Sequence, residues 1–330
     1  MSPHGSADSL PRASARRRIA AALALCLPLL AAEAPAHEID QYSSREVDLA
    51  DSTDVLNEEF NRVLRRIAEG WWRGEDRAQF AKRVFHTLGG IYLIDKYERW
   101  ARRSPDVETL RMSRDESIYR GGPFWATRVV FFFGLGPVMR LDDQLVGTDK
   151  MGHFLSQGWK YHKRHLRGAS EEEVVGIGQR NEAGIFGYMT TGVFSNADLV
   201  ANYEGYLFYR SLFEDDIVPG KPAIIEWLGS GARLQRPFDW RDHVNAYWDE
   251  ALNPGLYDGL LESRVVSHLE EFCDDYEESP EDFVPDDDAE LAARYEVLRL
   301  RDASRYRLDH LCSERTAATS EATVRTVANR

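Results

Sequence analysis

The sequence is poor in cysteine, in basic residues and in long apolar runs. Its 330 residues include three Cys, and 41 Lys and Arg stand against 55 Asp and Glu, which gives a formal net charge of -14. A shortage of basic residues disfavours nucleic acid as a partner, because that binding depends on neutralising phosphates with Lys and Arg. The hydrophobic share of 43% is too high for a disordered chain. We therefore expect a folded protein with no nucleic-acid partner.

Short catalytic signatures are also missing. The sequence contains no Gly-x-Ser-x-Gly elbow, no His-Glu-x-x-His pair, no Walker phosphate loop and no glycine pattern for dinucleotides. Motifs of this kind therefore assign no reaction, and whether the protein is an enzyme stays open at this stage.

The first apolar run is too short to cross a bilayer. Residues 19–30 give 12 apolar-rich positions, whereas a spanning helix needs about 20. Three Arg at 16–18 precede this run, and the small residues Ala34 and Ala36 follow it. Such a pattern is typical of a secretory signal peptide. We predict a signal peptide over residues 1–36, cleavage near Ala36, and a periplasmic or secreted mature chain.

Cleavage would leave two cysteines, Cys273 and Cys312. An even number of Cys in an oxidising compartment favours a disulfide, and two free buried thiols are the alternative. The bridge would close a loop of about 40 residues and contribute roughly 3–4 kcal/mol.

Helical periodicity dominates the rest of the chain, and no strong two-residue alternation bounded by hairpin turns occurs. We predict an all-α helical bundle with one main domain. The expected parts are an N-terminal helical region (37–120), a core bundle (121–272), an acidic linker with a C-terminal helix (273–315) and a disordered tail (316–330). Helices are predicted at 54–68, 76–102, 149–167, 171–188, 195–213, 239–252, 260–272 and 290–311. Ser170 and Glu173 form a capping box for the fourth of these.

Polar residues gather on three of the predicted helices of the core bundle. Asp149 and His153 share one helical face, and Asp198 and Asn202 share another, because residues four apart are neighbours on a helix. Glu182 lies on the helix between them. If these helices pack together, the five side chains converge in an otherwise apolar interior, where polar groups need partners or a ligand.

Three interpretations of this convergence remain open. In the first, Asp149, His153, Glu182 and Asp198 bind one divalent metal such as zinc, manganese or magnesium. In the second, His153, Glu182 and Asp198 act as general acid and base, while substrate anions contact Lys150, Arg180 and Asn202. In the third, the cluster is a hydrogen-bond network that fixes helix register. Ser195 would then serve as N-cap, and Gly205 would allow close helix packing.

Three pieces of sequence carry a resemblance to a known family. They are Asp149-Lys150-x-x-His153-Phe154, then Glu182, then Phe194-Ser195-x-x-Asp198-Leu199-x-x-Asn202-x-x-Gly205. This order and spacing resembles the VanZ-like proteins and the YfiM-type periplasmic proteins, over residues 148–209 only. VanZ-like proteins are membrane-embedded, whereas this chain has no continuous apolar span. The resemblance implies a helical fold and a bacterial envelope setting, and it implies no particular reaction.

The leading hypothesis is an exported cell-envelope protein with a buried polar site. If it is an enzyme, hydrolysis or transfer on a phosphate-bearing envelope lipid or a cell-wall precursor fits the residues best. The alternatives are a non-catalytic envelope scaffold, and a peripheral membrane protein that inserts residues 124–139. That apolar stretch is otherwise expected to form a buried helix or hairpin.

Overall fold

The computed structural model describes residues 38–90, 94–122, 134–184, 188 and 191–313. The predicted signal peptide, most of the apolar stretch 124–139 and the predicted tail 316–330 lie outside the described residues. Among the described residues, no helix is long and apolar enough to cross a membrane.

The described fold is rich in helix but is not all-α, so that prediction is wrong. Three antiparallel two-stranded pairs accompany the helices. They join β1 (Val138–Leu141) to β2 (Gln144–Gly147), β3 (Val193–Phe194) to β6 (Leu256–Tyr257), and β4 (Ile225–Leu228) to β5 (Gly231–Leu234). Strands of two to four residues are too short to show a two-residue alternation. The β1–β2 turn also uses Asp142 and Asp143 at φ 50° and 60°, where glycine or asparagine is the usual signal.

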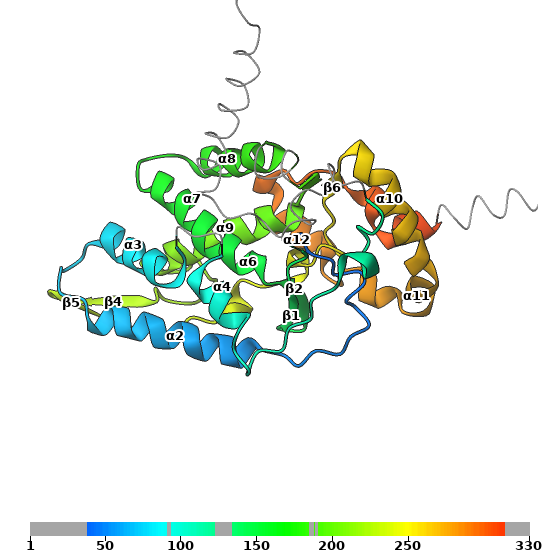
Figure 1. The fold of residues 1–330 in the computed structure, drawn as a ribbon. Coiled ribbons are helices and arrows are strands. Elements are labelled where there is room, and N and C mark those ends of the chain that lie inside the picture. The colour runs from blue at the N-terminus through cyan, green and yellow to red at the C-terminus, as the bar shows by residue number, and fades with distance from the viewer. Residues whose placement is uncertain (1–37, 91–93, 123–133, 185–187, 189–190, 314–330) are drawn as a thin grey trace, which may run out of the picture.

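Helices form the centre of the molecule, as the ribbon shows (Figure 1). One continuous helical segment consists of α6 (Asp149–Gly152), a π-helical turn η2 (His153–Gln157) and α7 (Gly158–His165). It packs against α9 (Asn196–Ser211), most of whose residues are buried. Helix α8 (Glu171–Ala183) contacts both, and its capping box at Ser170 and Glu173 is confirmed.

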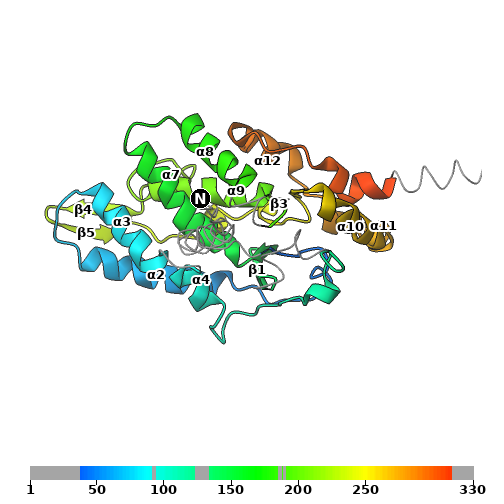
Figure 2. The ribbon, with the colours of Figure 1, turned by 45° about the horizontal axis from the view of Figure 1, so that its top comes forward.

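Two groups of elements lie at opposite ends of the molecule in both views (Figures 1 and 2). One end holds α2 (Thr53–Glu69), α3 (Arg77–Leu88) and the β4–β5 hairpin, with α4 (Lys96–Ala101) nearby. The other end holds α10 (Gly259–Leu269) and α11 (Cys273–Glu278), and α12 (Asp288–Arg294) lies between that end and α9. The predicted disulfide is confirmed: Cys273 and Cys312 are bonded, with their Cα atoms 5.4 Å apart.

One predicted helix is absent, and two others are divided. Residues 239–252 contain only the short 3-10 turns Trp240–Asp242 and Ala246–Trp248, because the side chains of Asp239 and Asn245 accept backbone N–H groups within each turn. Residues 290–311 are interrupted after α12, where Arg299 adopts a left-handed conformation at φ 48°. The expected helix 76–102 is divided into α3 and α4.

Two contacting glycines allow the central helices to approach closely. A Cβ atom on Gly158 would lie 2.5 Å from the backbone of Gly205, and one on Gly205 would lie 1.9 Å from the carbonyl oxygen of Phe154. Neither position therefore has room for a side chain. This close approach, which the sequence suggested for Gly205, brings the polar faces of the two helices together.

Candidate functional site

The predicted convergence of polar side chains occurs between the central helices. Asp149 and His153 come from α6 and η2, Asp198 and Asn202 come from α9, and all four are buried or nearly so. Glu182, near the end of α8, is also buried and lies close enough to Asp198 and Lys150 to interact with them electrostatically. We call these five residues, together with Lys150 and Glu250, the polar cluster.

Lys150 lies among three carboxylates in the polar cluster. Its Nζ atom lies 3.0 Å from Oδ2 of Asp149, 2.7 Å from Oδ1 of Asp198 and 2.6 Å from Oε1 of Glu250. The side chain of Lys150 is fully buried. Burial opposes its positive charge, but the three carboxylates outweigh burial and raise its pKa. Lys150 is therefore a permanently charged ammonium inside the protein.

His153 contacts an oxygen through each of its ring nitrogens. Nε2 lies 3.2 Å from Oδ2 of Asp198, and Nδ1 lies 3.0 Å from Oδ1 of Asn202. If Nδ1 donates to the Asn202 oxygen, then Nε2 and the Asp198 oxygen face each other and need a cation between them. A proton on Nε2 meets this need, and so does a metal ion. The π-helical turn begins at His153, as is common at functional sites.

Asp198 contacts both Lys150 and His153. Burial alone would raise its pKa, but His153 and Lys150 reverse that effect and hold the pKa of Asp198 below its ordinary value. Ser195 caps α9 as predicted, because its Oγ accepts from the Asp198 backbone N–H at 3.1 Å. Asp198 is therefore an ionised carboxylate in the cluster.

Three other carboxyls hold protons more tightly than usual. Burial is the main cause in each case. It raises the pKa of Glu250 to about 7, and neighbouring acids help it to raise the pKa of Glu38 and of Glu182 well above the ordinary range. The cluster contains more carboxyl groups than cations, so protons on these acids supply part of the charge balance.

A second pair of buried acids borders the same helical segment. Asp95 accepts from the hydroxyl of Ser156 at 2.6 Å and 2.8 Å. Glu98 lies against Gly152, where a Cβ atom would come within 3.1 Å of its Oε2. Burial raises the pKa of Asp95 to about 7, and burial together with Asp149 raises the pKa of Glu98 to about 8.

Three residues of the cluster form a group that can hold a metal ion. One ligand atom each from Asp149, His153 and Asp198 lie within 4.8 Å of one another. Oδ1 of Asp149 is buried and has no hydrogen-bond partner among the described residues. Glu182, which the sequence suggested as a fourth ligand, is not part of this group.

The suggested anion contacts occupy different environments. Lys150 is enclosed by carboxylates, so an anion would have to displace them to reach it. Asn202 is buried and engaged with His153. Arg180 is exposed on α8.

Sequence reasoning missed Glu38 and Glu250 and gave Ser195 only a capping role. Ser195 also donates from Oγ to Oε1 of Glu250 at 3.0 Å, and the Glu250 backbone N–H donates to Oε1 of Gln41 at 2.8 Å. Glu250 follows a short turn rather than lying on a helix, and Glu38 comes just after the predicted cleavage site. The one available signal was an acid beside Trp248 in an apolar-rich stretch.

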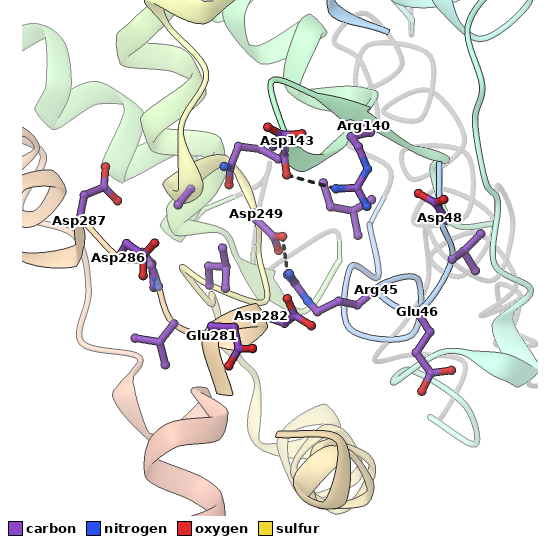
Figure 3. Close-up of a pocket in the computed structure, with 17 residues that line it drawn as sticks. Arg45, Glu46, Asp48, Arg140, Asp143, Asp249, Glu281, Asp282, Asp286 and Asp287 are labelled. Atoms are coloured by element: carbon purple, nitrogen blue, oxygen red, sulfur yellow. Dashed lines mark hydrogen bonds and ion pairs between the residues drawn. The ribbon is translucent and has the colours of Figure 1, made fainter. Parts of the chain in front are cut away.

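An acidic pocket of about 430 Å³ lies beside the cluster. Figure 3 shows Arg45 directed toward Asp249, with which it forms an ion pair, among acids that include Glu281 and Asp282 from the predicted linker. Asp249 precedes Glu250 in the sequence, but no residue that lines the pocket belongs to the polar cluster. An acidic lining alone does not define a binding site.

Comparison with known proteins finds no matching protein-family model, no matching curated protein and no matching solved structure. The resemblance to VanZ-like and YfiM-type proteins therefore stays a prediction from the motif residues.

Proposed function

We propose that this chain is an exported envelope protein whose polar cluster binds one divalent cation through Asp149, His153 and Asp198. One observation carries the proposal: a ligand atom from each of these residues lies within 4.8 Å of the others. The unpartnered Oδ1 of Asp149 adds a buried acceptor that a cation would satisfy.

The ligand types fit zinc, manganese or magnesium. One imidazole nitrogen with carboxylate oxygens suits such ions, and three protein ligands leave a position for water. Asn202 would orient the imidazole of His153 by accepting from its other nitrogen, as partners of metal-bound histidines usually do. We propose that the bound ion serves hydrolysis or transfer on a phosphate-bearing envelope lipid or a cell-wall precursor. In that reaction the protonated carboxyl of Glu182 would donate a proton.

Charge balance supports competition between the cation and protons. Lys150 is the permanent cation of the cluster, and the carboxyl groups around it outnumber it. A divalent ion would add positive charge and displace protons from the acids whose pKa is raised, Glu182 and Glu250. Metal affinity should therefore increase with pH, as expected when a ligand must first lose a proton.

Export is supported by the Cys273–Cys312 disulfide, because such bonds are typical of proteins outside the reducing cytoplasm.

A non-catalytic envelope scaffold is the second candidate, and the contacts of Lys150 favour it. Its ammonium already supplies a cation to Asp149, Asp198 and Glu250. The cluster would then be a structural network, with no need for a metal.

The metal content of the full chain separates these candidates. The protein should be purified without a histidine tag or chelator and analysed by mass spectrometry. We expect about one equivalent of a divalent metal. The metal should be lost in His153→Ala and kept in the control His310→Ala, which changes an exposed histidine. If the folded protein contains no metal and takes up none on titration at alkaline pH, the metal proposal is wrong and the non-catalytic scaffold is the remaining candidate.

A further inference from the structure

Helices α2 and α3 and the β4–β5 hairpin lie together at one end of the molecule (Figures 1 and 2). That end also carries a basic patch. It borders a cavity of about 360 Å³ between the end of α2, the following loop and α3. No acidic residue lines that cavity. We define the basic patch by the exposed basic and aromatic residues of the cavity lining: Arg66, Trp72, Arg73, Lys82, Arg83 and His86.

The positive charge of this patch contrasts with the rest of the protein. Residues 62–103 contain 11 Lys and Arg against five Asp and Glu, in a chain whose formal net charge is -14. The nearby acids Glu59 and Glu75 pair with Arg62 and Arg77. Within the described part of the chain, no ion pair involves Arg66, Arg73, Lys82 or Arg83, so their charge is available to a partner.

Exposed apolar side chains accompany the charge. Trp72 is 71% exposed, and the guanidinium of Arg73 lies over its ring at 5.3 Å. Leu228 is 50% exposed on the adjoining hairpin. The two loops touch, because the Gly74 backbone N–H donates to the Ser230 carbonyl oxygen at 2.8 Å.

We propose that the basic patch is a membrane-docking surface that binds an anionic phospholipid bilayer. Tryptophan prefers the interface between headgroups and acyl chains, and Lys and Arg are attracted to anionic lipid. An exposed tryptophan surrounded by unpaired cations, in an otherwise acidic protein, matches both requirements. Charge complementarity also orients the molecule, because this end is attracted to the bilayer while the acidic remainder is repelled. The proposal does not depend on a metal in the polar cluster.

Flotation of the full chain with lipid vesicles tests this docking. The protein should float with vesicles of phosphatidylcholine and phosphatidylglycerol at low salt, and high salt should release it. It should not float with phosphatidylcholine alone. Lys82→Glu combined with Arg83→Glu should weaken binding at least about tenfold, because each basic residue near an anionic surface contributes. The charge-matched control, Arg299→Glu combined with Arg305→Glu, changes exposed residues that follow α12 and should bind like the unaltered protein.

Trp72 gives a second test, because the substitution Trp72→Phe leaves the net charge unchanged. Brominated phospholipid should quench part of the tryptophan fluorescence, and Trp72→Phe should abolish that quenching while the protein remains folded. The proposal is overturned if the unaltered chain does not float, or if both charge-reversal pairs lose binding equally. It is also overturned if inorganic polyphosphate binds the patch while vesicles do not, since the partner would then be a soluble polyanion.

Discussion

Lys150 and Glu250 lie 100 residues apart in the sequence, yet the Lys150 ammonium nitrogen is 2.6 Å from Oε1 of Glu250. The contact joins the start of the central helix to Glu250, which lies two residues after the turn Ala246–Trp248. Because Lys150 also contacts Asp149 and Asp198, one buried ammonium balances charge contributed by three separate parts of the chain.

Lys150→Met should destabilise the fold by about 3–5 kcal/mol, because it leaves buried carboxylates without their cation. Urea unfolding followed by circular dichroism measures this loss. The control Lys163→Met changes an exposed lysine on α7 and should stay within about 0.5 kcal/mol of the unaltered protein. Adding Glu250→Gln to Lys150→Met should restore part of the stability. Equal losses of stability in Lys150→Met and in the control Lys163→Met would contradict the proposed charge balance.

Stability should fall as pH rises from about 5 to about 9. The folded pKa values of Asp95 and Glu250 are raised to about 7 and that of Glu98 to about 8. The folded protein therefore binds more protons than the unfolded chain above the ordinary carboxyl range, and this advantage is lost as each acid ionises. Each unit by which the folded pKa exceeds the unfolded pKa corresponds to a loss of about 1.4 kcal/mol in the free energy of unfolding once the acid has ionised.

Thermal unfolding at a series of pH values measures how steeply stability falls with pH. Glu98→Gln is the matched variant. Glutamine cannot ionise, so the variant should lose less stability than the unaltered protein as pH approaches about 9. An unchanged slope in Glu98→Gln would show that Glu98 does not contribute to it.

Gly205→Ala should destabilise the protein by about 3 kcal/mol or more, because the added Cβ would lie 1.9 Å from the Phe154 carbonyl oxygen. Backbone rather than a flexible side chain occupies that space, so the two helices would have to separate. Gly259→Ala is the control, since no atom lies within 4 Å of its added Cβ. Chemical unfolding compares the two, and a mild effect at Gly205 would contradict the close approach.

Reduction of the Cys273–Cys312 bond should lower the free energy of unfolding by roughly 3–4 kcal/mol in the chain-entropy model. The two cysteines are 39 residues apart, so the bond restricts a long loop in the unfolded chain. Thermal unfolding with and without a reductant measures the change. In Cys273→Ala combined with Cys312→Ala, the reductant should have no effect. If the reductant lowers the stability of that double variant by the same amount, the loss does not come from breaking the disulfide.

Patterns within a single helix predicted those features that depend only on residues close together in the sequence. The Ser170–Glu173 capping box was predictable because both residues belong to one helical turn. Asp149 with His153, and Asp198 with Asn202, were predictable as helical faces for the same reason. Their convergence required only that two helices pack, and the small residue Gly205 suggested such packing.

Long-range contacts and short strands were not predictable in this way. Glu250 and Glu38 reach the site from irregular segments, where no periodicity marks a buried face. The amphipathic pattern at 239–252 predicted a helix, but the side chains of Asp239 and Asn245 accept backbone N–H groups at the start of two short 3-10 turns instead. Two-residue strands such as β3 depend on a partner about 60 residues away, which no local pattern reveals.

The π-helical turn His153–Gln157 contains one residue more than an α-helical turn would place there. One residue of an α-helix corresponds to a rotation of about 100°. Deleting a residue from this turn would therefore rotate α7 about the helix axis relative to α6. Asp149 and Lys150 would keep their direction, while Gly158 would swing away from Gly205. The extra residue thus changes which face of the helix points toward α9. The first part of the helix directs charged groups inward, and the second part packs against α9.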